Sequence, residues 1–237
     1  MTHDDSLTLT IEATHRSLEQ RLREARRPHR DPHRPRDNYA ATDTFMAATS
    51  RHLAAVEASL LGRVRHQVPD GEQLCHHYLQ AARRLEHTLS LLKGRLYGEA
   101  HAIHLAWPEL WETVGSELGE HNRIEGELVE ALVRCRPDET DALARQVFES
   151  EVSGPTRPHP YTPHTGLFGL AARRMWAWAD RLWDAAEGRV IPDPVAPPHH
   201  RHDSLLAQYL VADPKFDADA TIVEHRHRVH PKAGGVT

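Results

Sequence analysis

Apolar residues recur with helical spacing in several separate stretches of the chain, and each stretch predicts one helix. From Asp43 to His66 the apolar positions lie three or four residues apart, which places them on one face of an α-helix. The same spacing occurs from Glu72 to Tyr97, from Trp107 to Cys135 and from Asp138 to Val152. A last periodic stretch runs from Leu167 to Glu187.

The predicted class is all-α. No stretch of useful length alternates apolar and polar residues with the period of two that a half-buried strand needs. Proline and glycine in VPDG, Val68 to Gly71, end the first long helix in a turn. Short connections between the first three long helices imply antiparallel neighbours. We therefore predict an antiparallel four-helix bundle with an additional C-terminal helix and irregular N- and C-terminal extensions.

Proline-rich stretches mark both ends of the predicted bundle. Residues 1–38 begin with a short helix from Leu7 to Arg27 and continue into RRPHRDPHRPRD, which cannot hold a regular helix. We expect this segment to be a loosely attached, partly disordered arm. The bundle is predicted over residues 39–191. Residues 192–237 are rich in Pro and His and predict a tail, in which Ser204 to Val211 has the pattern of a short helix.

Two polar residues interrupt the apolar stripe of the helix predicted from Trp107 to Cys135. At about 100° per residue, His121 and Glu125 fall on the same side as the stripe. Glu117 lies one turn before His121, near the edge of the stripe. Burying an unpaired carboxylate costs on the order of several kcal/mol. A metal ion, a partner from a neighbouring helix or water must therefore compensate for this charge.

Polar residues at the midpoints of two other helices lie level with His121. His52 is central in the helix predicted at 43–66, and Glu86 is central in the helix predicted at 72–97. In an antiparallel bundle these side chains lie at one depth, with Glu125 one turn away. Imidazole nitrogens and carboxylate oxygens from facing helices suit iron, manganese or zinc. A buried hydrogen-bond network that binds no ion explains the same pattern equally well.

The loop GPTRPHPYTPHTG, which follows Val152, contains two more histidines. His159 and His164 alternate there with prolines, which restrict the backbone and lower the entropy cost of holding an imidazole in place. His159 is therefore a candidate ligand that reaches into the end of the bundle. A rigid loop that packs Tyr161 over the core is the alternative.

Composition and charge exclude several classes of protein. The formal net charge of −5 argues against a nucleic-acid partner, because phosphate neutralisation needs a clustered positive face. No run of about 18 uncharged apolar residues is present, so we expect no membrane span. The start, MTHDDSLTLT, does not have the pattern of a secretory signal. Cys75 and Cys135 are too few for a disulfide framework, and we expect a cytoplasmic protein.

Four motifs together carry a resemblance to a known family. They are FMAATSRHLAAVEASLL around His52, ARRLEHTLSLLKGRLYG around Glu86, ELGEHNRIEGELVEAL around His121 and PTRPHPYTPHTG around His159. Residues 40–190 resemble bacterial hemerythrin-like proteins, the HHE cation-binding domain family, and the last motif is similar to the Pro-His loop of actinobacterial members. The resemblance implies a non-haem di-iron centre in a four-helix bundle. It also implies oxygen binding, or the sensing or removal of oxygen, peroxide or nitric oxide.

The resemblance also assigns roles to individual residues. His52 is similar to the ligand from the first helix, Glu86 to the carboxylate from the second helix that bridges the irons, and His121 to a ligand from the third helix. Glu125 stands where oxygen carriers usually have a histidine.

The chain departs from the family pattern at two further places. Ala82 stands where the second helix usually has a histidine, four residues before its glutamate. His159 and His164 have the spacing of the histidine and aspartate of the fourth helix, but within a proline-broken loop. A rearranged or mononuclear site, a site with altered metal preference, and a metal-free bundle all remain open.

We therefore expect one or two non-haem iron ions, with ligands drawn from His52, Glu86, His121, Glu125 and His159. The expected role is oxygen- or redox-linked binding or sensing, with dioxygen or another small redox ligand as the partner. The sequence favours a binding protein over an enzyme, because no signature of a nucleophile or phosphate loop is present. The competing hypothesis is a metal-free helical scaffold that recruits a protein partner through its arm or tail.

Overall fold

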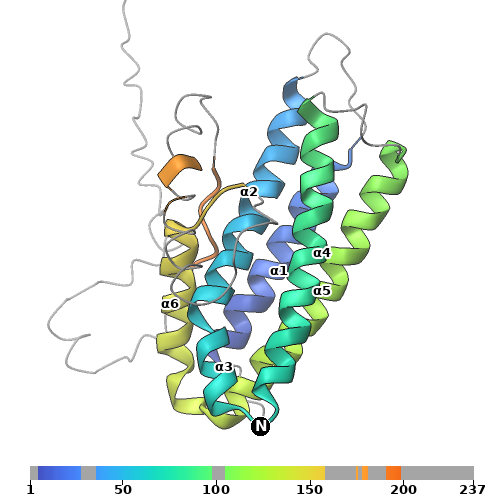
Figure 1. The fold of residues 1–237 in the computed structure, drawn as a ribbon. Coiled ribbons are helices and arrows are strands. Elements are labelled where there is room, and N and C mark those ends of the chain that lie inside the picture. The colour runs from blue at the N-terminus through green and yellow to red at the C-terminus, as the bar shows by residue number, and fades with distance from the viewer. Residues whose placement is uncertain are drawn as a thin grey trace, which may run out of the picture. The chain divides into compact units, whose positions relative to one another are not determined.

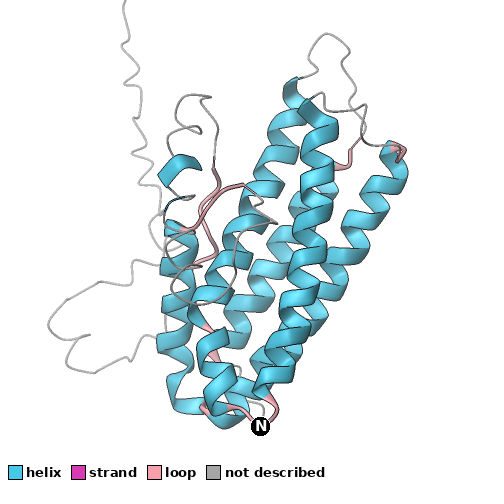
Figure 2. Cartoon of the chain, in the orientation of Figure 1, coloured by secondary structure: helices cyan, strands magenta, loops and turns pink. Residues whose placement is uncertain are grey.

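The structure is a computed structural model that describes residues 5–27, 36–97, 105–157, 175, 178–180 and 191–198 (Figure 1). Within these ranges every regular element is helical, which confirms the predicted all-α class (Figure 2). Among the described helices, none combines the length and the apolar composition that a membrane span needs. The chain divides into two compact units, Met1–Pro198 and His199–Thr237, and all the described ranges belong to the first.

Five long or medium helices and two short ones make up the described part of the chain. In chain order they are α1 (Ser6–Ala25), α2 (Arg36–Ser59), α3 (Leu61–Gln67), α4 (Gly71–Tyr97), α5 (Trp107–Cys135), the 3₁₀ helix η2 (Pro137–Glu139) and α6 (Thr140–Ser153). The helices α1, α2, α4 and α5 run in alternating directions, as predicted for antiparallel neighbours (Figure 1). α1 packs against α2 and α5, α4 packs against α5, and α6 packs against α1 and α2.

Most predicted helix boundaries agree with the structure, but the single helix predicted from Asp43 to His66 is two helices, α2 and α3, with Leu60 between them. The predicted start at Asp43 was wrong, because α2 begins at Arg36, immediately after the last proline of the arm. Proline fixes φ and removes an N–H, so a helix can extend back only as far as such a residue allows. The predicted helix Leu167 to Glu187 lies outside the described residues except for four helical positions, 175 and 178–180. The short helix predicted at 204–211 also lies outside them.

The turn between α3 and α4 shows how VPDG ends a helix. Asp70 has a φ of 56°, in the left-handed region that aspartate tolerates better than most residues. At Gly71 a Cβ atom would lie 2.0 Å from the carbonyl oxygen of Val64, so only glycine fits. The Gly71 amide donates to the Val68 carbonyl at 3.0 Å and closes the turn. This geometry returns α4 antiparallel to α2.

The N-terminal helix α1 confirms the helix predicted from Leu7 to Arg27, but its packing departs from the sequence prediction. Asp5 caps it by accepting a hydrogen bond from the Thr8 amide at 2.8 Å. One face of the helix is buried: Ser6, Leu7, Thr10, Ile11, Thr14, Leu18, Leu22 and Ala25. The prediction of a loosely attached arm over residues 1–38 was therefore wrong for Ser6–Ala25. Burial of this apolar face holds α1 against α2, α5 and α6.

The packing of α1 can be tested by truncating one side chain. Ile11 is 2% exposed, so we expect Ile11→Ala to lower the free energy of unfolding by about 2–4 kcal/mol through lost burial and a cavity. Val152 is 51% exposed, so Val152→Ala should change the free energy of unfolding by less than about 0.5 kcal/mol. Urea unfolding measures both. Equal effects of the two changes would contradict the packing of α1 described above.

Candidate metal centre

A polar cluster lies where four helices meet, and each of its members interrupts an otherwise apolar face. Glu125 on α5 is fully buried, and His121 one turn before it is 1% exposed. His52 reaches the same place from α2 and is also 1% exposed. His15 comes from α1, with 12% of its side chain exposed. The apolar stripes that bury the helices therefore carry these side chains into the core.

The carboxylate of Glu125 lies among three imidazole rings. Its Oε1 is 3.0 Å from Nε2 of His52, and its Oε2 is 3.5 Å from Nε2 of His15 and 3.6 Å from Nδ1 of His121. One ligand atom each from His15, His52 and Glu125 lie within 4.8 Å of one another. Such spacing suits a single ion held by two imidazole nitrogens and one carboxylate oxygen.

Close approach does not give these atoms hydrogen bonds of good geometry. Among the described residues, Nε2 of His15, His52 and His121 and both carboxylate oxygens of Glu125 have no hydrogen-bond partner. Buried polar atoms normally have one, and each atom left without a partner costs about 1–3 kcal/mol. Nε2 of His15, Nε2 of His52 and the carboxylate of Glu125 therefore face a shared space without being satisfied there, whereas His121 turns its Nδ1 toward Glu125.

A second carboxylate fixes the orientation of His52. Nδ1 of His52 lies 2.7 Å from Oε1 of Glu151 on α6, in a buried hydrogen bond. Arg51 holds the same part of α6, because its Nε donates to the Glu151 carbonyl oxygen at 2.5 Å. Its Nη1 donates to the Pro192 carbonyl at 2.8 Å and ties in the extended segment 191–198. With Nδ1 bonded to Glu151, Nε2 of His52 is directed at Glu125, as in a ligand with an outer partner.

Tyr78 on α4 closes one side of the cluster. Its ring lies edge-on to His121, with 5.0 Å between the centroids, and its hydroxyl donates to the Leu53 carbonyl at 3.5 Å. Burial and the negative charges of Glu125, Glu57 and Glu86 raise the pKa of Tyr78 well above its usual value. The phenol therefore remains protonated.

The charges in the cluster follow from burial and from the arrangement of the groups. Burial lowers the pKa of His52, but Glu125 and Glu151 outweigh it and raise that pKa to about 10. Burial, with the charges of His52 and His15, lowers the pKa of His121 to about 4 despite the opposing charge of Glu125. Burial raises the pKa of Glu125, but His52 and His15 outweigh it and hold that pKa well below its usual value. Without a metal, His52 is an imidazolium beside two carboxylates, and His121 is neutral.

Of the five residues predicted as ligands, the structure brings three into direct contact: His52, His121 and Glu125. Glu86 is buried on α4, and its charge acts on Tyr78, but the converging ligand atoms come from other residues. His159 lies outside the described residues. Glu117, weighed as a third polar group on α5, instead pairs with Nε of Arg84 at 3.0 Å.

Two members of the cluster, His15 and Glu151, were not predicted. His15 follows Ile11 by four residues and precedes Leu18 by three, so it interrupts the stripe of α1. Glu151 follows Val147 by four residues and extends the buried face of α6. The signal that singled out His121 and Glu125 was therefore present in both helices. His15 was missed because it lay in the segment interpreted as an arm.

Comparison of the chain with protein-family models, with curated proteins and with solved structures finds no match. The hemerythrin-like resemblance therefore stays a prediction from the motifs. What the structure adds is an all-α fold with a buried His/Glu cluster that can hold a metal ion.

The raised pKa of His52 predicts a pH dependence for the metal-free protein. In the folded protein the pKa of His52 is about 10, above its ordinary value of 6.5. Protonated His52 therefore makes its full contribution to the free energy of unfolding below about pH 6.5, and this contribution is lost as the pH rises through about 10. Between these values the folded state holds one more proton. The free energy of unfolding should fall by up to about 1.4 kcal/mol per pH unit from this group.

Urea unfolding at pH 6.5 to 9 with a chelator present measures this decrease. His52→Gln should flatten it, whereas the exposed His66→Gln should leave it as in the parent protein. A decrease of the same size in all three proteins would show that His52 is not the group responsible.

Proposed function

We propose that the cluster binds a non-haem metal ion, with iron as the physiological metal, in an oxygen- or redox-linked binding or sensing role. The observation that carries this proposal is the convergence of buried nitrogen and oxygen atoms that lack hydrogen-bond partners among the described residues. A metal ion satisfies several such atoms at once, whereas water or one more hydrogen bond satisfies fewer. The donor set of imidazole and carboxylate suits iron, manganese or zinc, and the motif resemblance favours iron.

His15, His52 and Glu125 are the residues that would hold the ion. Glu151 orients His52 through Nδ1, and Arg51 holds the backbone of Glu151, so one ligand arrives already positioned. His121 is neutral, so its ring is available as a further nitrogen donor beside the same carboxylate. If a second ion binds, Nε2 of His121, which has no hydrogen-bond partner among the described residues, is a further nitrogen available to it.

The surroundings favour a binding or sensing role over catalysis of a polar reaction. The helices that supply the ligands bury them at 0–12% exposure, which keeps bulk water away from the centre. Bound iron supplies a redox-active centre for a ligand as small as dioxygen. Tyr78 stays protonated, and its hydroxyl is bonded to a backbone carbonyl, so it contributes shape and polarity rather than a mobile proton.

Metal content in matched variants tests the proposal. We expect the full chain, loaded anaerobically with Fe(II) and then desalted, to retain iron with at least tenfold higher affinity than Glu125→Gln, because Glu125 contributes the central carboxylate. Glu127→Gln is the control, since Glu127 is on the same helix with 55% of its side chain exposed. The histidines beyond residue 198 are unchanged in all three proteins, so weak binding by them cancels.

Elemental analysis gives the ion count, and an absorption spectrum before and after exposure to air shows whether the bound iron responds to oxygen. Equal iron retention in Glu125→Gln and Glu127→Gln would overturn the proposed site. Tight iron binding without any spectral change in air would keep the metal site and remove the oxygen-linked role.

The second candidate function is a metal-free scaffold that binds a protein partner. It is favoured by the contacts of His52, whose two ring nitrogens both face carboxylates at 2.7 and 3.0 Å, an arrangement that holds charge without an ion. In a scaffold the buried polar groups would set only how the helices pack.

Replacing His121 separates the two functions. If the protein is a scaffold, the melting temperature of His121→Leu should equal or exceed that of the parent protein, because an apolar side chain replaces a buried neutral imidazole. For a metal protein, added Fe(II) should raise the melting temperature of the parent more than that of His121→Leu. Thermal unfolding with and without Fe(II) measures both effects. Leu132→Ala, which affects a core residue outside the cluster, should keep the full metal-dependent increase.

A further inference from the structure

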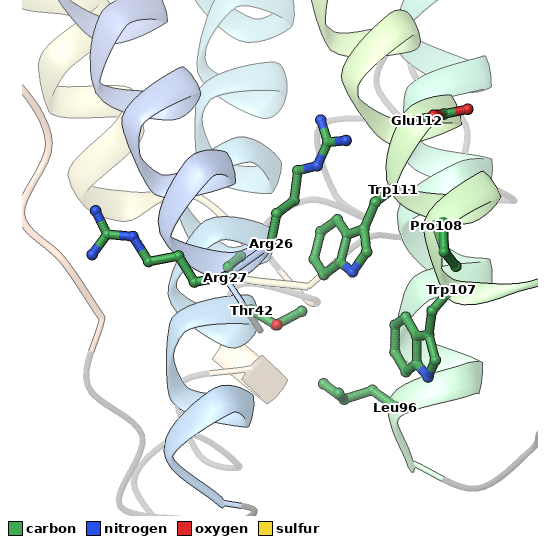
Figure 3. Close-up of a pocket in the computed structure, with 9 residues that line it drawn as sticks. Arg26, Arg27, Thr42, Leu96, Trp107, Pro108, Trp111 and Glu112 are labelled. Carbon is green, nitrogen blue, oxygen red and sulfur yellow. The ribbon is translucent and has the colours of Figure 1, made fainter. Parts of the chain in front are cut away.

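A pocket of ≈ 480 Å³ lies at the end of the helices where α1 stops and α5 begins (Figure 3). Its walls include Arg26, Thr42, Leu96, Trp107, Pro108 and Trp111. The volume falls within the range of about 300–1,000 Å³ typical of small-molecule sites. None of the residues of the His/Glu cluster lines it. Trp107 is fourteen residues from His121 on α5, about 21 Å along the helix axis.

One wall of the pocket is aromatic. Trp107 and Trp111 lie on successive turns of α5, with their ring centroids 6.2 Å apart and their planes at 22°. Both rings are partly exposed, and in Figure 3 they lie on the side of α5 that faces Thr42 and Leu96. Two nearly parallel indoles with a leucine beside them offer flat apolar surface. A planar aromatic ring can stack on such a surface and remove it from water.

A guanidinium lies next to the aromatic wall, at its Trp111 end. Arg26 follows the last residue of α1, and its guanidinium lies on the Trp111 side of the pocket (Figure 3). Its Nη1 is 3.4 Å from the position that a Cβ atom on Gly115 would occupy, so the side chain crosses from α1 to α5. The Arg26 amide donates to the Leu22 carbonyl at 3.0 Å, but its guanidinium has no hydrogen bond or ion pair with another described residue. The carboxylate of Glu112, the acidic residue of the lining, points away from the pocket in Figure 3.

A second guanidinium, on α4, contacts Trp107. Cζ of Arg95 on α4 lies 5.3 Å from the centroid of a Trp107 ring, in a cation–π contact. Of the charged residues that line the pocket, Arg26 and Arg27 are cationic and Glu112 is anionic, so the lining is net positive in a chain whose formal net charge is −5. Positive charge at the rim of an apolar site selects an anionic ligand, because a guanidinium binds a carboxylate through two parallel hydrogen bonds.

From this arrangement we propose that the pocket binds a small planar aromatic carboxylate. The ring system stacks against Trp107 and Trp111, and the carboxylate meets Arg26. This site is separate from the proposed metal centre in its residues and in its chemistry, so either proposal stands if the other fails.

The test is a titration of the full chain with naphthalene-2-carboxylate, in which isothermal calorimetry and tryptophan fluorescence measure the binding. We expect one saturable site per chain and at least tenfold weaker binding of naphthalene-2-methanol, which has the same rings without the charge. Arg26→Gln should lose most of the preference for the carboxylate and keep the binding of the alcohol. Trp111→Leu should weaken the binding of both compounds.

Arg23→Gln is the matched control, because Arg23 lies on the last turn of α1 with 67% of its side chain exposed and pairs with Glu19. It should bind naphthalene-2-carboxylate as the parent protein does. Arg26 also lies at the surface end of α1, so Arg26→Gln should fold normally, and a circular dichroism melt confirms this for each variant. The proposal is overturned by a parent protein without saturable binding, by equal affinity for the acid and the alcohol, or by Arg26→Gln behaving like Arg23→Gln.

Discussion

Burial of the Glu125 carboxylate is the constraint on which the rest of the polar core depends. A carboxylate at 0% exposure is costly, and three imidazoles from α1, α2 and α5 lie within 3.6 Å of its oxygens. The helices must therefore pack so that these rings arrive at one depth. His52 is in turn held by Glu151, which places α6 against α2. The register of four helices thus follows from one charged group and its partners.

The apolar packing and the polar cluster support one another. Side chains such as Leu118 and Leu128, one turn or so to either side of the pair on α5, are fully or almost fully buried, so the cluster is enclosed along the helix axis. This enclosure strengthens every electrostatic interaction inside it, because water no longer screens the charges. His52 and His121 are equally buried, so their widely different pKa values come from their partners: Glu151 adds a second carboxylate beside His52, whereas the charges of His52 and His15 act on His121.

Periodicity in the sequence was enough to predict the long helices and the residues of the core that interrupt them. The structure confirms the helix Trp107–Cys135 and the inward positions of His52, His121 and Glu125. The spacing of apolar residues along an amphipathic helix predicts which side chains point inward. His15 was not predicted, since local composition near Pro28 hid a buried stripe that depends on packing with distant helices. Partner distances and the Arg51 contact to Pro192 are tertiary properties that no local pattern encodes.

The ligands of the centre are far apart along the chain, and this affects how the protein is made. His52 and Glu151 are separated by 99 residues, and His15 precedes both. Each helix can form locally as it leaves the ribosome, but the cluster requires contacts of long sequence separation, which form late. The histidines of α1 and α2 lack Glu125 until α5 has been synthesised, and His52 lacks Glu151 until α6 has been synthesised. The full set of contacts around the centre is therefore possible only after α6, which supplies Glu151, has been synthesised.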